Sequence, residues 1–425
     1  MRIEVICTGD EVLTGKIVNT NFTYISQKLE DHGLSVKWET TVGDDREDLL
    51  QAFRAAGERA DAVIVNGGLG PTVDDLSQEV AAQAVGVELE LHEGWLGRMQ
   101  EMFARRGRAM SPNNVKQAML PVGAELIDNR VGTACGFGVT IGRARFYFTP
   151  GVPRELRPML EREILPRLLQ RSGNQAVIHL KRFHSFGLGE SHVDALLDGV
   201  ADLAPEGSVK LGFRAHYPQL ETKLTVRGQD QADMAAKLAP VEQEVRRRIG
   251  NFILAEDDDT LEGVVLSLLA ERRATLAVVE TLTGGQVAAR LAALPGAERV
   301  FRRGTVACSG AELSAALSMT EIRSAGKPTV EMAAAAAEAA RRQSDATHGL
   351  AVLVDMQADA SGHEEGGAIT LAIATQDSAA GRCSYLAGGR DWVRLGAIEM
   401  ALDSVRRLLQ GLPVDEKIDF EKTAT

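Results

Sequence analysis

The chain has 425 residues, and 47 Lys and Arg against 59 Asp and Glu give it a formal charge of −12. This acidic balance argues against general electrostatic binding to nucleic acid, and no apolar run reaches the roughly 20 residues that would cross a membrane. Glu4 and Asp10 lie where a signal peptide would be apolar, and the four cysteines are dispersed. We therefore expect a reduced, cytoplasmic protein with no membrane partner.

Residues 1–170 alternate strand-like and helix-like patterns, which predicts an α/β domain with helices layered on a sheet. The strands are expected at residues 2–8, 36–42, 62–65, 137–141 and 144–149. The helices are expected at residues 21–32, 45–59, 74–85, 93–106 and 153–170.

The remainder of the chain predicts two further domains. Residues 171–250 show a small α+β pattern, with strands at 175–186 and 219–227 and helices at 190–197 and 231–249. Residues 251–259 are interpreted as an acidic connector, in which Asp259 is suited to cap a helix at 260–273. A second α/β alternation fills residues 259–412, with strands at 276–279, 350–354 and 369–374 and helices at 285–294, 331–342 and 393–409.

The most informative stretch is AVIVNGGLGPTVDDLSQE, residues 62–79, where a buried strand ends in a glycine-rich turn and a helix is expected to begin near residues 72–75. Glycine amides and a helix N-terminus at the end of a parallel strand favour a phosphate. Asp74 and Asp75 would repel that phosphate, so either they cap the helix or a divalent cation bridges them to it. Because neighbouring helical residues point about 100° apart, only one of the two is expected to ligate the cation directly. A plain glycine turn before an acidic, capped helix is equally compatible with the local sequence.

Polar or glycine-rich segments follow other strands of the same domain. Residues 8–11 (TGDE) end the first strand, and Asn19 and Asn21 open the first helix with side chains suited to capping or to ribose hydroxyls. Residues 129–134 (NRVGTA) precede a strand, and residues 148–155 (FTPGVPRE) turn from a strand into a helix. Each segment alone is compatible with a cap or a turn. Together they predict one crevice, because loops at one edge of a sheet converge.

In this order and spacing, TGDEVLTGKIVNTN, NGGLGPTVDD, KQAMLPVGAELI, NRVGTACGF and FTPGVPREL resemble the competence/damage-inducible CinA family over essentially the whole chain. The resemblance implies a three-layer, molybdopterin-binding (MoaB/Mog-type) α/β domain over residues 1–170 and a KH-like α+β domain over 171–250. It implies a CinA-type α/β domain over 259–412, which deamidates nicotinamide mononucleotide in active members. It also implies a metal-dependent ADP-ribose pyrophosphatase, with Mg, Mn or Co as the divalent ion, a nucleotide as the small-molecule substrate, and a homodimer.

Matched by motif, the expected catalytic residues are Asp10, Glu11, Asp74, Asp75 and Glu155. The expected metal ligands are Asp74, Asp75 and Asp10. The expected substrate-binding residues are Thr8, Gly9, Asn19, Asn21, Gly67, Gly68, Gly70, Thr72, Gly151 and Pro153. A cation would neutralise the pyrophosphate and position a water, while the glycine amides would stabilise charge on the phosphoryl oxygens. Glu11 or Glu155 would serve as the general base, unless both only cap helices.

The deamidase motifs of the family are altered in this chain. Its ESCTGG signature reads ETLTGG, with Thr281 in place of the serine nucleophile. Its YSxxxK pattern has Cys308 for the tyrosine and Leu313 for the lysine, and a hydroxyl nucleophile without a base is weak. Its TGIAGPGG loop corresponds to residues 354–361, which contain no glycine and two aspartates. We therefore expect no deamidation, although the late GxRxxxR pattern is kept at Arg390 and Arg394.

Three functions are compatible with the sequence. The first is hydrolysis of a nucleotide pyrophosphate by the N-terminal domain, with a non-catalytic C-terminal domain. The second is a regulatory module that binds a nucleotide or a pterin without turnover, and the third is a scaffold in which both sites are remnants. Nucleic-acid binding is not expected, because the nearest match to a GXXG clamp, residues 187–190, is one residue short and acidic.

Overall fold

The computed structural model describes residues 1–173, 177–205, 207–319, 328–358, 362 and 364–421. The chain divides into two compact units, Met1–His179 and Leu180–Thr425, which are described separately. Within the described ranges, no helix is both long enough and apolar enough to cross a membrane.

The first unit is built on a six-stranded sheet with the strand order β2-β1-β3-β8-β7-β6. Its strands are β1 (Ile3–Thr8), β2 (Val36–Val42), β3 (Ala62–Asn66), β6 (Glu125–Ile127), β7 (Gly136–Ile141) and β8 (Ala144–Thr149). The strands β2, β1, β3 and β8 are parallel, whereas β7 pairs antiparallel with β8 and β6. Every residue of β1 and β3 is buried, as expected for central parallel strands that are covered on both faces. A separate antiparallel pair is formed by β4 (Leu89–Leu91) and β5 (Met119–Pro121).

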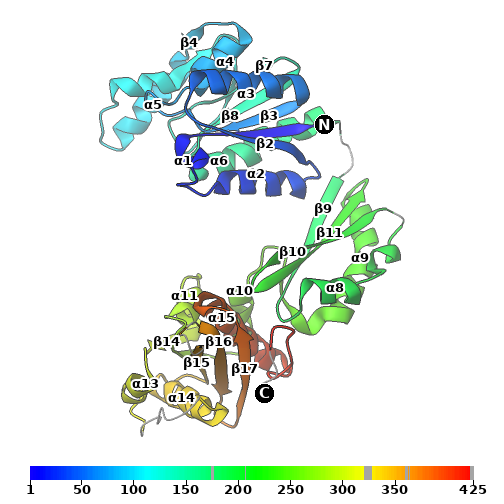
Figure 1. Cartoon of the computed structure of the whole chain (residues 1–425), viewed down its shortest axis with the longest axis vertical. Helices are drawn as coiled ribbons and strands as arrows, with labels where there is room; N and C mark the ends of the chain where they lie inside the picture. The colour runs from blue at the N-terminus through cyan, green and yellow to red at the C-terminus, as the bar shows by residue number, and fades with distance from the viewer. Residues whose placement is uncertain (174–176, 206, 320–327, 359–361, 363, 422–425) are drawn as a thin grey trace. The chain divides into compact units, whose positions relative to one another are not determined.

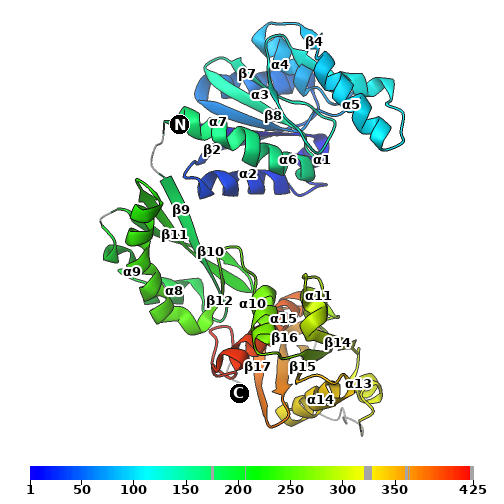
Figure 2. The same ribbon diagram turned by 180° about the vertical axis from the view of Figure 1, so that it is seen from behind.

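Helices cover both faces of this sheet, which gives three layers (Figures 1 and 2). One face carries α3 (Arg46–Arg59), α4 (Ser77–Val85) and α5 (Glu93–Arg105). The other face carries α2 (Thr20–Asp31), α6 (Pro153–Met159), η2 (Leu160–Ile164) and α7 (Leu165–Ser172). Two short segments are α1 (Asp10–Leu13) and η1 (Pro112–Ala118). The prediction of a three-layer α/β domain is confirmed.

The helix that the sequence predicts at residues 153–170 is interrupted. It runs as α6, a π-helical turn and α7. Pro158 lies inside α6 and Pro166 opens α7, and neither has an amide hydrogen to donate. Such prolines are a recognised cause of local changes in helix geometry.

The second unit begins with a four-stranded sheet in the order β10-β11-β9-β12. Its strands are β9 (Val177–Ser185), β10 (Val209–His216), β11 (Gln219–Gly228) and β12 (Ile253–Glu256). Its helical segments are α8 (Glu190–Leu196), η3 (Val200–Leu203), α9 (Gln231–Ile249) and η4 (Gly250–Phe252). The sequence missed β10 and β12, and residues 253–256 of the expected connector are a strand that pairs with β9. Residues 175 and 176 of the expected first strand lie outside the described residues.

The second unit ends with a five-stranded sheet in the order β14-β13-β15-β16-β17. Its strands are β13 (Leu276–Glu280), β14 (Phe301–Val306), β15 (His348–Ala358), β16 (Glu364–Ala374) and β17 (Ala379–Ala387). Its helices are α10 (Leu261–Glu271), α11 (Gln286–Ala292), α12 (Ala297–Val300), α13 (Gly310–Ala316), α14 (Val330–Gln343) and α15 (Arg390–Gln410). Thr260, rather than the predicted Asp259, caps α10 by accepting a hydrogen bond from the Gly263 amide at 3.2 Å.

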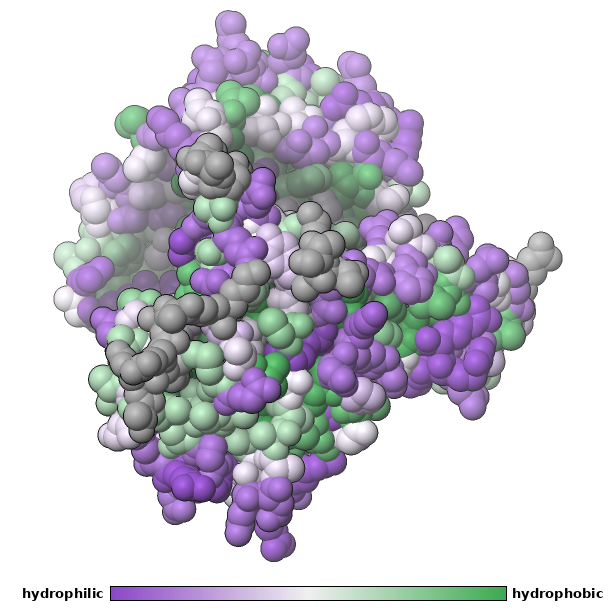
Figure 3. Space-filling view, turned by 60° about the horizontal axis from the view of Figure 1, so that its bottom comes forward, coloured by the Kyte–Doolittle hydropathy of each residue, from purple (hydrophilic) through white to green (hydrophobic). Residues whose placement is uncertain are grey.

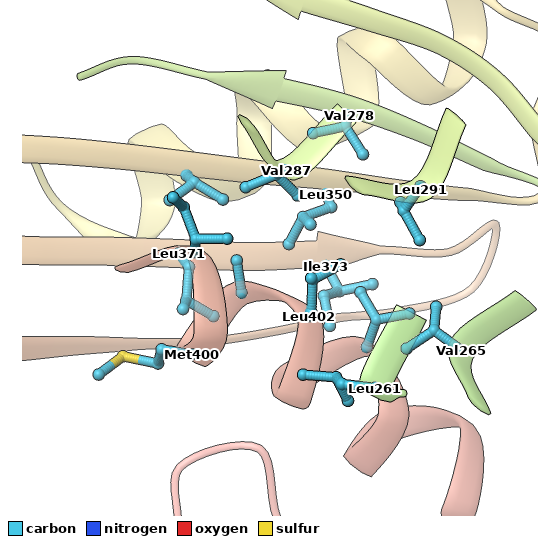
Figure 4. Packing of buried hydrophobic residues seen from close by; sticks show 14 of the residues in the cluster. Leu261, Val265, Val278, Val287, Leu291, Leu350, Leu371, Ile373, Met400 and Leu402 are labelled. Carbon is cyan, nitrogen blue, oxygen red and sulfur yellow. The ribbon is translucent and has the colours of Figure 1, made fainter. Parts of the chain in front are cut away.

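The core of this last domain lies between the sheet and α10, α11 and α15. Figure 4 shows Leu350 and Ile373 of the sheet beside Leu402 of α15. A second cluster packs α13 and α14 on the opposite face. Hydrophilic and apolar residues are interspersed over the face drawn in Figure 3, as is usual for a protein surface.

Contacts within the second unit join its two sheets. The ring of Tyr217, in the turn between β10 and β11, stacks on Trp392 of α15 with centroids 3.4 Å apart. Gln219 Nε2 donates to the buried Glu399 Oε1 at 2.5 Å. The C-terminal segment adds Asp419, whose Oδ2 accepts from the Gly189 amide at 2.8 Å. The C-terminal domain therefore serves as a packing partner of the KH-like domain.

Candidate functional site

The carboxyl ends of four neighbouring parallel strands meet at one edge of the first sheet, and the loops that follow them surround a hollow of about 700 Å³. Every residue that the sequence predicts for this site lines the hollow except Asp10. These residues are Thr8, Gly9, Glu11, Asn19, Asn21, Gly67, Gly68, Gly70, Thr72, Asp74, Asp75, Gly151, Pro153 and Glu155. The site is thus assembled from segments far apart in the sequence.

The glycine-rich loop after β3 forms the floor of the hollow. Gly67 and Gly68 have φ angles of 118° and 68°, which favour glycine. A Cβ on Gly67 would also come within 2.8 Å of the Thr8 carbonyl oxygen. Within the described part of the chain, the amides of residues 68–70 donate to no protein acceptor. The three residues that carry these amides line the hollow.

Asp74 and Asp75 do not lie in the first turn of a helix, and that prediction is wrong. The helix α4 begins at Ser77, and Asp75 closes the preceding turn by accepting a hydrogen bond from the Thr72 amide at 2.8 Å and another from the Thr72 hydroxyl. Such side-chain-to-backbone bonds compete with helix formation. Asp74 is exposed and forms no hydrogen bond or ion pair with any described residue. Of the two carboxylates, Asp74 is the one left free for a ligand.

Asp10 is not among the residues that line the hollow, whereas Asp44 is. Asp10 Oδ1 accepts from the Asp44 amide at 3.2 Å, and Asp44 Oδ2 accepts from the Asp10 amide at 3.1 Å. Burial raises the pKa of the Asp44 carboxyl, and the negative charges of Asp10, Glu11 and Asp74 raise it further, against the lowering effect of the Asp10 hydrogen bond. Sequence reasoning missed Asp44, although it follows the end of a predicted strand as Asp10 does.

The carboxylates on the hollow are not neutralised by the protein. Glu11, Asp44 and Asp74 form no ion pair with any Lys, Arg or His that the structure describes. In the same part of the chain, no three His, Cys, Asp or Glu side chains are grouped as a metal site. Mg²⁺ is commonly held by one or two carboxylates together with waters and substrate phosphate oxygens. These carboxylates alone therefore do not make a complete metal site among the described residues.

A network around the buried Asn66 ties the loops together. Asn66 Nδ2 donates to Thr149 Oγ1 at 3.1 Å and to the Pro150 carbonyl at 2.8 Å. Asn21 Nδ2 donates to Asn66 Oδ1 at 2.8 Å and to the Gly151 carbonyl at 2.7 Å. The side chain of Asn66, whose role the sequence did not indicate, thus fastens the start of α2 to the ends of β3 and β8.

Two other predicted side chains have structural partners. Asn19 caps α2, because its Oδ1 accepts from the Phe22 amide at 3.0 Å. Glu155 Oε2 accepts from Asn129 Nδ2 at 2.8 Å, and Asn129 Oδ1 accepts in turn from the Gly132 amide at 3.0 Å. The NRVGTA segment is therefore a turn built on Asn129, which holds Glu155 at the wall of the hollow.

The region that corresponds to the family's deamidase site is occupied by structural contacts. Thr281 Oγ1 accepts from the Val354 amide at 3.0 Å. Glu280 is fully buried, and its carboxylate accepts from the Val287 and Ala288 amides at the start of α11. Leu313, in place of the family's lysine, is fully buried in the apolar cluster beneath α13 and α14.

The segment that corresponds to the family's glycine-rich loop is a strand for most of its length. The strand β15 continues to Ala358 and pairs with β16, so that Asp355 lies opposite Ala368. Residues 359–361 of that segment lie outside the described residues. Arg390 pairs with Glu364, and Arg394, which is partly buried, pairs with Asp391 at 3.0 Å.

The fold and its domain order define a class of protein: a molybdopterin-binding-type α/β domain followed by a KH-like domain and a CinA-type domain. Three family models match, described as Probable molybdopterin binding domain (residues 4–170), Damage-inducible protein CinA KH domain (180–255) and CinA C-terminal domain (258–409). The chain is 36% identical over 422 residues to a CinA-like protein of Geotalea uraniireducens, covering 99% of this chain and 100% of the relative. It is 38% identical over 424 residues to a CinA-like protein of Frankia casuarinae, covering 98% of each. The chain belongs to the CinA-like protein family.

Two solved structures match a part of this chain. The crystal structure of CinA from Thermoplasma acidophilum is 35% identical and covers 40% of this chain and 96% of that chain, with a TM-score of 0.35. The crystal structure of the molybdopterin biosynthesis enzyme MoaB from Thermus thermophilus is 19% identical and covers 40% of this chain and 92% of that chain, with a TM-score of 0.28.

Proposed function

We propose that the N-terminal hollow binds a nucleotide pyrophosphate of the ADP-ribose type together with a divalent cation, and hydrolyses it. One juxtaposition supports this most: residues 68–70, whose amides donate to no described protein acceptor, line the same hollow as Glu11, Asp44 and Asp74. Amides at such a loop attract phosphate, whereas carboxylates repel it. A divalent cation held by these carboxylates would offset their charge and that of the phosphate.

The protein side chains have distinct tasks in this proposal. When bound, the divalent cation supplies the charge that neutralises the diphosphate and lowers the pKa of a water. Asp44 and Asp74 hold that cation, and the amides of residues 68–70 donate to phosphoryl oxygens. Glu155 or Glu11 accepts the proton of the attacking water. Water adds to one phosphorus and the bridging P–O bond breaks, which yields AMP and ribose 5-phosphate.

We further propose that the C-terminal domain does not deamidate nicotinamide mononucleotide. The Thr281 hydroxyl is held by a backbone amide of β15, and Leu313 is buried in the core. A hydroxyl without a neighbouring base is a weak nucleophile at neutral pH.

Incubation of the full chain with ADP-ribose tests the first proposal. AMP and ribose 5-phosphate should form with Mg²⁺, Mn²⁺ or Co²⁺, and a chelator should stop their formation. Asp74→Asn should reduce turnover by at least about a hundredfold, which corresponds to about 2.7 kcal/mol. Glu58→Gln, an exposed carboxylate on α3 that does not line the hollow, is the matched control.

Two other outcomes would change the assignment. Stoichiometric binding of ADP-ribose without products would identify a binding module, and product formation that is indifferent to metal or to Asp74→Asn would refute the cation site. Nicotinamide mononucleotide assayed in parallel should release no ammonia.

A further inference from the structure

Several large apolar side chains of α1 and of the loops that follow the strands of the first sheet are exposed. Leu13, Ile17, Val18, Val73 and Val152 are each at least half exposed, and Val18 and Val73 reach 79% and 90%. Of these, Ile17, Val18 and Val152 line the hollow and are called the apolar rim. Clustered apolar side chains left in water on a folded domain indicate a contact site.

The apolar rim and the polar floor belong to one cavity but differ in chemistry. The polar floor, meaning residues 68–70 together with Glu11, Asp44 and Asp74, offers backbone amides and carboxylates, whereas the side chains of the apolar rim contain no hydrogen-bonding group. Inorganic diphosphate on the floor would leave the apolar rim in water. A ligand that carries a flat, weakly polar group at a short distance from a diphosphate would cover both surfaces. The volume of about 700 Å³ lies in the usual range for a ligand of that size.

We propose that the apolar rim is a base subsite, which packs against the face of the purine or pyrimidine of a nucleoside diphosphate whose phosphates lie on residues 68–70. This rests on the diphosphate binding of the proposed function but not on hydrolysis. Branched aliphatic side chains gain dispersion and lose exposed apolar area against a base. Without hydrogen-bonding groups, they distinguish bases poorly. The site therefore selects nucleoside diphosphates over inorganic diphosphate and accepts different bases.

The continuity of the apolar rim with the polar floor favours a ligand over a second copy of the chain as its occupant. A protein surface on the apolar rim would have to close a hollow whose floor carries unneutralised carboxylates and free amides. Burying such groups without partners is costly. A ligand that brings its own phosphates and cation satisfies them.

Calorimetric titration of the full chain with ADP, UDP and inorganic pyrophosphate, each with Mg²⁺, tests the subsite. The double variant Ile17→Thr/Val18→Thr keeps the branching at Cβ but replaces the ethyl group of Ile17 and one methyl group of Val18 by hydroxyls. It should raise the Kd for ADP and for UDP about tenfold and leave the Kd for pyrophosphate unchanged. Val122→Thr, which alters a side chain that is 48% exposed but does not line the hollow, should change none of them.

The outcomes separate this proposal from the preceding one. Equal losses for ADP and pyrophosphate, or no loss for either, would overturn the base subsite and leave hydrolysis untouched. If the double variant raises the Kd for ADP but the wild-type chain does not hydrolyse ADP-ribose, the proposed hydrolysis would be refuted and the base subsite would be retained. A drop in molecular mass by light scattering in the ligand-free double variant would instead assign the apolar rim to contact between copies. A wild-type chain that binds neither compound would overturn the polar floor on which the subsite rests.

Discussion

Replacing Asn66 by alanine tests whether one buried amide holds the hollow together. The change removes three hydrogen bonds: two to Thr149 Oγ1 and the Pro150 carbonyl, and one from Asn21. At about 1 kcal/mol each, their loss should lower the free energy of unfolding of the first unit by about 3 kcal/mol. Asn21→Ala should cost about 1 kcal/mol, because that side chain is only partly buried and is more easily replaced by water.

Tryptophan fluorescence during urea unfolding can report this loss. The chain has three tryptophans, of which Trp38 and Trp95 lie in the first unit and Trp392 lies in the second. In a Trp392→Phe background, the signal follows the first unit alone. This separation is needed because a multidomain chain does not unfold in one step.

The substitution Asn66→Asp tests the same hydrogen-bond network through the pH dependence of stability. The carboxylate has no donor for the Pro150 carbonyl, and its burial should raise its pKa above the value in the unfolded chain. The folded state of Asn66→Asp then binds more protons than the unfolded state, so its stability should fall as the pH rises from about 4 to 8. A loss below about 1 kcal/mol for Asn66→Ala, or the same stability of Asn66→Asp at both pH values, would refute the role of Asn66.

Two further changes test the Asp44 carboxyl at the hollow and the region that corresponds to the family's deamidase site. The pKa of Asp44 is raised, chiefly by burial, so the native state holds that proton more tightly and its stability falls as the pH rises. Asp44→Asn should therefore stabilise the first unit at pH 8, by less than about 1 kcal/mol because Asp44 is partly exposed and its charge is screened. In the same urea assay, this gain in the free energy of unfolding should vanish near pH 4. Thr281→Ser should release no ammonia from nicotinamide mononucleotide, because it restores neither the lysine replaced by Leu313 nor the glycine-rich loop replaced by β15. Measurable ammonia would contradict that interpretation.

The carboxylates of the hollow show how much of the site can be predicted from local sequence. Residues 66–71 were identified correctly as a glycine loop at a strand end, because apolar runs and glycines are local signals. Asp10 and Asp44 occupy equivalent places after parallel strands, yet only Asp44 lines the hollow. Each carboxylate accepts a hydrogen bond from the other residue's amide, and the pairing of β1 with β2 brings the two residues together. The two side chains could not be ranked without that pairing.

The sequence by itself determined which segments form the central strands of both α/β domains, where the chain turns, and which motifs belong to the family. It determined these because hydrophobic periodicity, glycine and helix caps act over a few neighbouring residues. Only the tertiary structure decided that β12 completes the middle sheet and that Asp75 closes a turn while Asp74, which also lines the hollow, has no hydrogen-bond partner among the described residues. Strand pairing joins distant segments, and the direction of a polar side chain depends on the donors that the fold places beside it.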